Sequence, residues 1–425
     1  MIDLTGGMAS RPTVPSVENA GVVCVRRRST NCHFFVTPYI ASRGSAWCTR
    51  DDNQLTIAGL LGDTSRRDRD YRDGMDRTLN GPRILRLWAR YALLAAAATS
   101  VLPNALAQET PLLSGGISFF TNTSRGYTTY LPLTEPLLAA PVGKHLMIES
   151  RAALLESFFP RGNGMSGYDH SYTAALTYVQ GDYIASRHAT VVAGSYLVPF
   201  GTYNERLSPV WINNLQDGPF IANLPFMATG LGGELRGSAL SNGRYSIDYA
   251  GFFSARSDNE QFNAMRSSGG RVDLYLPQER LEAGFSYGRL LQGTRENFYG
   301  VHLWWEPEKT ALRLRSEYAR GAHAEGYWIE ADYRSQAFGG LDSFVGRFEP
   351  VFRIQQTFRI DNLATDGLPS TDTQRPEIGI DYNLPHNARI LTSYSRQFSS
   401  AGDHNIWETG IVYRFLFPAW KGHSK

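Results

Sequence analysis

The sequence lacks any long run of apolar residues. No stretch reaches the roughly 18 apolar residues that a membrane-spanning helix needs, and the mean hydropathy of the 425 residues is −0.30. These values exclude a helical membrane protein. They do not exclude a membrane protein built from strands, because lipid-facing and lumen-facing residues then alternate and their hydropathies average out.

Cysteine and lysine are scarce in most of the chain. The three cysteines, Cys24, Cys32 and Cys48, all precede Ala107, and only four lysines follow it. Beyond Ala107 there are 28 Arg and Lys residues against 31 Asp and Glu residues, a near-neutral balance that argues against a nucleic-acid partner. The 22 Tyr, 22 Phe, 8 Trp and 41 Gly are instead typical of strands and turns.

Residues 75–107 have the three parts of a secretory signal peptide. Four arginines from Arg77 to Arg90 form the positive part, residues 91–102 form a short apolar part, and Ala105 and Ala107 form an Ala-x-Ala cleavage site. The apolar part is too short for a membrane anchor helix. Because such a signal does not work easily behind 74 polar residues, we interpret residues 1–74 as an upstream or leader segment outside the fold.

From residue 144 onward, apolar and polar residues alternate with a period of two, the pattern of strands with one apolar face. Between residues 312 and 318, Leu312, Leu314 and Tyr318 are predicted to face lipid, whereas Arg313 and Arg315 are predicted to face the lumen. The segments run for about 10–12 residues, which is the span of a tilted membrane strand.

The connections between these segments alternate in length. Short polar turns are predicted near residues 184–187, 241–244, 277–280, 306–309, 336–341 and 385–387, and longer loops at 157–170, 200–226, 256–268 and 356–373. Bacterial barrels have short periplasmic turns and long outside loops. The sequence therefore predicts an all-β fold, a transmembrane antiparallel up-and-down β-barrel of about 14 strands over residues 144–415, followed by a tail at 416–425.

The segment 108–143 leaves two interpretations open. Residues 116–133 could add a hairpin and make sixteen strands, or the whole segment could be an irregular periplasmic stretch before the barrel.

Two passages resemble Gram-negative outer-membrane porins, broadly the phosphate-selective porin O and P group. One is Gly-Ser-Tyr-Leu-Val-Pro-Phe-Gly-Thr-Tyr-Asn-Glu-Arg-Leu at residues 194–207, and the other is the last strand, where Trp407, Thr409, Ile411, Tyr413 and Phe415 alternate. The chain departs from the pattern because ten residues follow Phe415. The phosphate-selective porins have a row of basic residues along the lumen. No such row is evident here, since acidic residues accompany the arginines on the predicted lumen face. The resemblance implies an outer-membrane channel of unspecified solute.

Charged side chains on the predicted lumen face are the candidates for lining a water-filled channel, where they would set the electric field for ions. They are Arg151, Arg187, Arg236, Arg271, Arg313, Arg315, Glu317, Glu330, Asp332, Arg353 and Asp381. The alternative is a narrow or plugged lumen in which these charges only pair with one another.

Loop 200–226 carries Trp211 and Phe220, which are unusual in a freely solvated loop. One interpretation is a loop folded into the pore as a constriction. It would present Asn204, Glu205, Arg206, Asn213, Asn214 and Asp217. The alternative is an outside loop that packs on its neighbours or on another subunit. If the loop enters the pore, we expect Arg187 and Arg236 to face Glu205 and Asp217.

The function that these patterns favour is passive diffusion of small hydrophilic solutes or ions across the bacterial outer membrane. The histidines are scattered without ligand spacing and no G-x-S-x-G motif is present, so we predict no enzyme, catalytic residue, cofactor or metal site. A non-conducting barrel that acts as an adhesin, and less so a barrel hydrolase, are the alternatives. Expected partners are outer-membrane lipid and small solutes or ions, with a homotrimer left open.

Overall fold

A computed structural model describes residues 25–29, 32–36, 110–161, 166–224, 228–308, 310–340, 342–361 and 368–419. The predicted signal peptide, most of residues 1–74 and the end of the tail lie outside these ranges. Within 1–74 the described residues form a two-stranded antiparallel sheet of β1 (Val25–Ser29) and β2 (Cys32–Val36). Among the described residues, no helix is long and apolar enough to cross a membrane.

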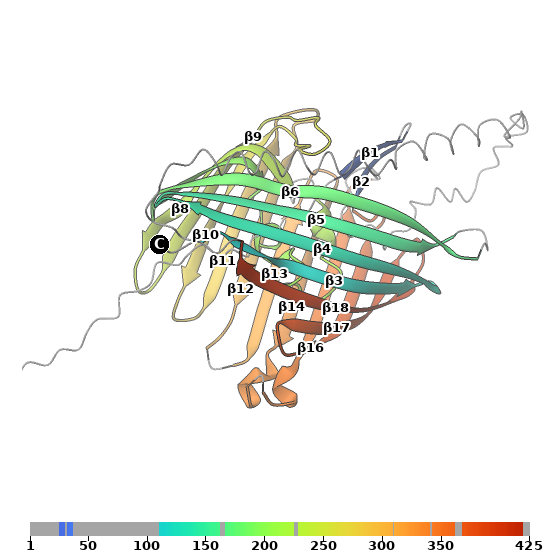
Figure 1. The fold of residues 1–425 in the computed structure, drawn as a ribbon. Helices are drawn as coiled ribbons and strands as arrows, with labels where there is room; N and C mark the ends of the chain where they lie inside the picture. The colour runs from blue at the N-terminus through green and yellow to red at the C-terminus, as the bar shows by residue number, and fades with distance from the viewer. Residues whose placement is uncertain are drawn as a thin grey trace, which may run out of the picture. The chain divides into compact units, whose positions relative to one another are not determined.

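The main structure is a closed barrel in which every strand pairs antiparallel with its neighbours in the sequence, and β18 closes the ring onto β3 (Figure 1). Its sixteen strands are β3 (Leu112–Ser124), β4 (Tyr127–Val142), β5 (Leu146–Pro160), β6 (Tyr168–Ser186), β7 (Ala189–Leu197), β8 (Thr229–Ser241), β9 (Ser246–Ser254), β10 (Ser267–Leu276), β11 (Leu281–Leu290), β12 (Asn297–Trp305), β13 (Leu312–Arg320), β14 (Ala324–Tyr333), β15 (Phe348–Arg359), β16 (Thr373–Asn383), β17 (Ala388–Ser399) and β18 (His404–Pro418). The predicted up-and-down barrel is confirmed, with the larger of the two strand numbers considered.

The barrel extends beyond the predicted bounds of 144–415. Residues of segment 108–143 form β3 and β4, and β18 runs past Phe415 to Pro418, which pairs with Leu112. Beyond this pair the backbone N–H of Ala419 donates to the carbonyl of Pro111, at 2.7 Å. The irregular interpretation of 108–143 is therefore wrong for Leu112–Val142. Closing the barrel explains the longer strands, because an unpaired edge cannot be satisfied in lipid.

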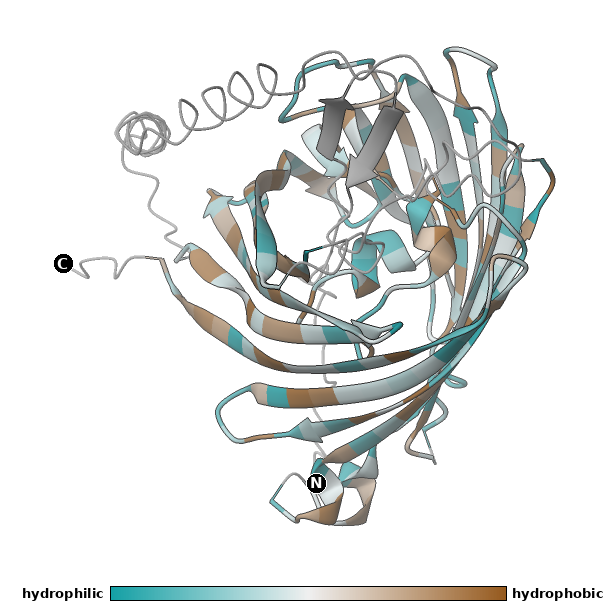
Figure 2. Ribbon diagram, turned by 90° about the vertical axis from the view of Figure 1, so that its right-hand side faces the viewer, coloured by the Kyte–Doolittle hydropathy of each residue, from teal (hydrophilic) through white to brown (hydrophobic). Residues whose placement is uncertain are grey.

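The outer face of the barrel is apolar all the way round. Its exposed large side chains include Ile117, Ile148, Val191, Leu235, Phe253, Val272, Phe285, Val301, Ile329, Phe352, Ile378, Ile390 and Ile411. Apolar and polar residues alternate along the strands in Figure 2. A continuous apolar surface of this extent is unfavourable in water and is the lipid-facing band of a membrane barrel. The chain is a transmembrane β-barrel.

The predicted strand register is also confirmed in β13. Arg315 and Glu317 are buried inside the barrel, and Leu314, which directly precedes Arg315, points the other way. One connection differs from the expectation of a short turn at 336–341. Residues 334–347 form a longer connection with two helical turns, η4 (Ser335–Phe338) and η5 (Val345–Arg347), seen as the orange lobe of Figure 1.

Candidate functional site in the barrel interior

The connection between β7 and β8 folds into the barrel, as Figure 2 shows. Its described residues, 198–224, contain one π-helical turn, η2 (Tyr203–Leu207), and one 3₁₀ turn, η3 (Phe220–Asn223). We call residues 198–224 the inner loop. Most of its side chains are buried, and Phe200 and Asn204 are completely inaccessible. The barrel wall thus shields the prolines and apolar side chains of the loop, whose exposure to water would be unfavourable.

The first half of the inner loop is held by β10, β11 and β13. The backbone N–H groups of Thr202 and Tyr203 both donate to Oε2 of Glu317 on β13, each at 3.2 Å. On β10, Arg271 bonds Glu205 of the loop. These contacts satisfy the donors of a helical turn and the charge of a buried carboxylate.

A further ion pair joins the same half of the loop to β11. Arg206 Nη1 lies 2.6 Å from Glu282 Oε1, and the loop N–H of Gly201 donates to Ser286 Oγ at 3.0 Å.

The second half of the inner loop is held by β15, β16 and β17. Arg375 Nη1 on β16 lies 2.6 Å from Asp217 Oδ2, and Arg353 on β15 donates to the carbonyl of Asp217. Arg389 on β17 donates to the carbonyl of Asn213 and to Asn214 Oδ1, the latter at 3.1 Å. Charge-assisted bonds of this kind are the stronger hydrogen bonds of proteins, so this half is fixed by guanidinium groups.

The loop also reaches the opposite wall. Val210 N–H donates to Glu135 Oε2 on β4 at 2.9 Å. In the closed ring of sixteen strands, β4 lies eight strands from β12, and the strands beside β12 hold Arg206 and Thr202. The inner loop therefore spans the barrel from one wall to the other.

Charges on β13–β16 form a continuous row across the inner wall. Cross-strand pairing places Arg315, Glu330, Arg353 and Glu377 side by side, so that positive and negative groups alternate. Arg315 bonds Glu330, whose other oxygen lies 2.5 Å from Arg353 Nη2. We call these four residues the charged row. All four side chains are at most 2% exposed, so each charge is neutralised by its neighbours rather than by water.

The inner face of β3–β5 is different, because a cluster of apolar side chains lies among its polar ones. Phe120, Leu131, Leu133, Leu137 and Leu155 form one cluster that includes Val210 and Trp211 of the inner loop. We call this surface the apolar wall. Gly116 makes room for the loop, since a Cβ there would lie 2.8 Å from Trp211 and 2.9 Å from Val210.

One guanidinium lies within the apolar wall. Arg151 Nη2 donates to Glu135 Oε1 at 2.7 Å, and its guanidinium lies over the Trp211 ring at 5.2 Å from the centroid. The ion pair and the cation–π contact together explain how this charge is accommodated there.

Ten of the eleven predicted lining residues project inward, and the exception is Arg187. The structure places Arg187 in the exposed turn between β6 and β7, where its Nε donates to His188. Arg236 lies on the inner wall of β8 and pairs with Asp182 at 2.6 Å. The expected position of Arg187 opposite Glu205 and Asp217 is therefore wrong, because Arg187 lies at the end of the barrel opposite the loop connections, whereas Arg236 lies within electrostatic range of Glu205.

All six predicted loop residues lie inside the barrel. They are Asn204, Glu205, Arg206, Asn213, Asn214 and Asp217. The wall residues that contact the two carboxylates are Arg271 and Arg375. Arg375 was missed, although it shares the inward parity of Asp381 on β16, and Glu135 was missed because its strand lacks polar alternation.

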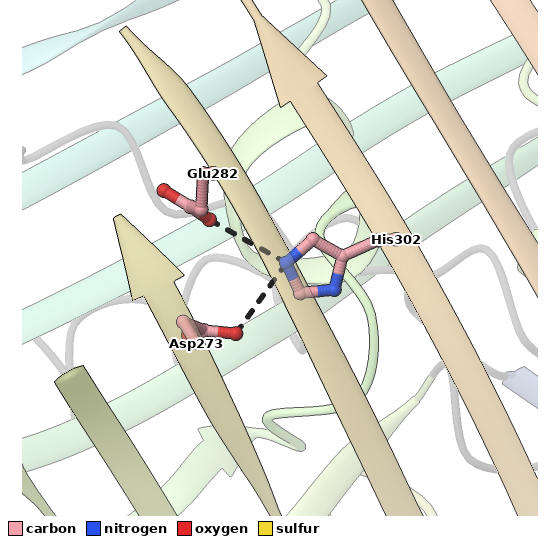
Figure 3. Close-up of side chains that lie close together, drawn as sticks. All are labelled: Asp273, Glu282 and His302. Carbon is pink, nitrogen blue, oxygen red and sulfur yellow. Dashed lines mark ion pairs between the residues drawn. The ribbon is translucent and has the colours of Figure 1, made fainter. Parts of the chain in front are cut away.

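Three side chains on β10–β12 have the geometry of a metal-ligand group: Asp273, Glu282 and His302 (Figure 3). One ligand atom of each lies within 4.8 Å of the others. No spacing along the chain indicates this group, because its members come from three strands.

No family model and no curated protein matches the chain. Solved structures with a similar fold include OmpF of Salmonella typhi in complex with daunomycin, at 12% identity over 72% of this chain and 98% of that chain, with a TM-score of 0.49. The anion-selective porin from Comamonas acidovorans matches at 12% identity over 72% and 100%, with a TM-score of 0.47. OccK7 (OpdD) of Pseudomonas aeruginosa matches at 13% over 73% and 100%, with a TM-score of 0.43. These likenesses carry no argument about what this barrel does.

Proposed function

We propose that the protein is a bacterial outer-membrane channel through which small hydrophilic solutes or ions diffuse, and that the inner loop narrows the path. The observation that carries this proposal is the inner loop, held by both walls inside a closed barrel of sixteen strands. Barrels of 16–18 strands have enough width for an aqueous channel. A loop that crosses this width leaves a smaller passage beside it.

The location in the outer membrane rests on three features. Closed antiparallel barrels with an even number of strands and an apolar outer band are typical of that membrane. Both ends of the barrel chain lie at the end where most turns are short. The expected signal peptide at residues 75–107 would supply export.

Selection by charge follows from how the loop is anchored. Glu205 and Asp217 face Arg271 and Arg375 from the loop side. The dipoles of such contact ion pairs, beside a narrow passage, would set a local field that acts on passing ions. Small solutes of suitable charge would therefore pass beside the loop, and larger ones would be excluded.

Planar-bilayer recording of the purified barrel tests the channel. We expect discrete, stable steps of current for the wild type. Replacing residues 207–223 by a short Gly/Ser linker should raise the single-channel conductance and admit larger solutes, provided that gel mobility shows a folded barrel. Silence of both proteins contradicts the channel. Equal conductance of both contradicts the narrowing role of the loop.

Reversal potentials in a salt gradient test the charge filter. Glu205→Asn with Asp217→Asn should shift ion preference toward anions, whereas Arg375→Gln should shift it toward cations. Asp169→Asn is a matched control, because Asp169 is an exposed carboxylate that pairs with Arg161 outside the barrel interior. If the control shifts the preference as much as the loop variants do, the selective charges lie outside the inner loop.

A trimer stays a prediction of the sequence. Chemical cross-linking in native membranes, with the number of linked chains read on gels, tests it directly.

A further inference from the structure

The register of β10–β12 brings an acid and a histidine together across a glycine. Asp273 pairs with Gly284, and Gly284 pairs with His302. Since Gly284 has no side chain, its neighbours meet above it: a Cβ there would lie 2.2 Å from His302 Cε1 and 2.3 Å from Asp273 Oδ1. Glu282 is two residues before Gly284 and so points to the same face, as Figure 3 shows.

The imidazole of His302 is buried without a hydrogen bond. Its side chain is 0% exposed, and neither ring nitrogen has a hydrogen-bond partner. Nε2 points at Asp273 Oδ1 and Glu282 Oε1, at 3.4 and 3.5 Å. These separations exceed the usual 2.7–3.2 Å of an N–H···O bond. Buried polar groups are satisfied in nearly all native structures, so two unpartnered atoms, His302 Nε2 and Asp273 Oδ1, that face each other beside Glu282 Oε1 call for an explanation.

A metal ion between these three atoms fits the two distances measured from His302 Nε2, and the two carboxylate oxygens lie within 4.8 Å of each other. Zinc binds imidazole nitrogen and carboxylate oxygen at about 2.0–2.2 Å in a tetrahedral arrangement. Two ligand atoms of such a site are then roughly 3.3–3.5 Å apart, by the geometry of a tetrahedron with those bond lengths. The separations from His302 Nε2 to Asp273 and to Glu282 match this value.

The surrounding charges leave room for a cation. Arg271 Nε donates to Asp273 Oδ2 at 2.8 Å, which leaves Oδ1 free, whereas Arg206 Nη1 donates to Glu282 Oε1 at 2.6 Å, so this oxygen would bind a metal with its other lone pair. Such outer partners orient ligating carboxylates in metal sites. Glu205 is bonded to Arg271, and Glu317 lies within electrostatic range of His302 and Arg271. Four carboxylates thus face two guanidinium groups, and a divalent cation balances the difference when the imidazole is neutral.

We propose that Asp273, Glu282 and His302 bind one divalent transition-metal ion of the zinc class, with a fourth position open to water. The ligand set of one imidazole and two carboxylates suits zinc better than calcium or magnesium, which prefer all-oxygen sites. The site adjoins Arg206 and Glu205, so a bound ion stabilises the part of the wall that anchors the first half of the inner loop.

The chain contains a matched control for this proposal. His323, in the turn between β13 and β14, also contacts two carboxylates: Nδ1 lies 2.5 Å from Asp361 Oδ2 and Nε2 lies 3.2 Å from Glu296 Oε1. The two acids lie at different nitrogens of the ring, so they do not converge with one nitrogen on a single point. We therefore expect no metal at His323.

Calorimetric titration of ZnCl₂ into the chelator-treated, folded barrel tests the site, and Co²⁺ reports the geometry through its visible absorption. We expect one Zn²⁺ per chain and a tetrahedral Co²⁺ spectrum. His302→Ala and Asp273→Asn should each weaken binding by more than about 100-fold, beyond the 10–100-fold typical of outer-shell partners. His323→Ala should bind as the wild type does.

Folding of each variant is checked by heat-dependent gel mobility, and Asp273→Asn, which keeps the side-chain shape, decides the result if His302→Ala does not fold. The proposal is overturned if the wild type shows no saturable Zn²⁺ binding, which would leave a protonated His302 as the partner of both acids. It is also overturned if Asp273→Asn binds as tightly as the wild type. Neither result depends on whether the barrel conducts.

Discussion

The inner wall of the barrel is built in two ways. On β3–β5 it carries an apolar cluster covered by Val210 and Trp211, whereas on β13–β16 it carries the charged row and is contacted by the carbonyl of Asp217. The inner loop contacts both surfaces, with Val210 and Trp211 on the apolar wall and the carbonyl of Asp217 on the charged row. A second apolar part of the loop, including Ile221, packs against Trp328 of β14. Each wall requires a different neighbour: an apolar surface must be shielded from water, and buried charges must be paired.

The largest expected effect comes from placing a charge in the apolar wall. Leu137 is 1% exposed and pairs across strands with Arg151. Leu137→Arg should lower the free energy of unfolding by about 5 kcal/mol or more, since several kcal/mol for burying an unpaired charge add to the lost leucine packing. We expect the heat-modifiable band to disappear on gels, and Leu137→Met to retain it. A folded Leu137→Arg barrel would mean that water reaches this wall.

Breaking the charged row should have the next largest effect. Glu330 bonds both Arg315 and Arg353, so Glu330→Gln leaves two buried guanidinium groups short of a partner. We expect a loss of about 3–5 kcal/mol in urea unfolding of the barrel. Glu349→Gln, whose half-buried carboxylate pairs with Arg313 at 3.1 Å, is the matched control and should lose much less. Equal losses would show that the charged row depends on ion pairing no more than the pair of Glu349 with Arg313 does.

The outer faces of the two halves should not differ, because the same lipid covers both. Ile117 on β3 is 48% exposed and Ile378 on β16 is 59% exposed. Ile117→Arg and Ile378→Arg should each cost about 2–4 kcal/mol near the bilayer midplane, measured by refolding into lipid vesicles at graded urea, and the alanine variants should cost far less. A large difference between the two arginine variants would place the two strands at different depths.

The smallest expected effect is a pH dependence of local stability at His323, in the turn between β13 and β14. The hydrogen bond to Asp361 is the main reason that the pKa of His323 is raised, and Glu296 adds to it. A raised pKa means that the contribution to stability is complete below the unfolded-state value near 6.5 and is lost as pH rises through the folded-state value. The protection factor of the amide of Ile360, which donates to the carbonyl of His323, should fall as the pH rises through the folded-state pKa of His323, once the intrinsic pH dependence of exchange has been divided out. His323→Asn should remove this pH dependence, and an unchanged dependence would assign it to another group.

The difference between the two inner walls explains which strands could be predicted from the sequence. On β13, Arg313, Arg315 and Glu317 alternate with apolar residues, so strand and register could be predicted. On β4, Leu131, Leu133 and Leu137 point inward while Pro132 and Leu138 lie on the other face. Apolar residues on both faces remove the period-two signal, which is why the predicted barrel began at residue 144 and left β3 and β4 open.

The sequence by itself determined the class of the fold and the inward side of the charged strands, since alternation is local and fixed by the pleat of a strand. It also singled out the inner loop by its aromatics and charges. Only the tertiary structure decided which charges meet: Arg375 with Asp217, Arg271 with Glu205, and His302 with Asp273 across Gly284. These partners are set by cross-strand register and by where the loop crosses the barrel, which depend on closing the ring of strands and are not encoded in any single segment.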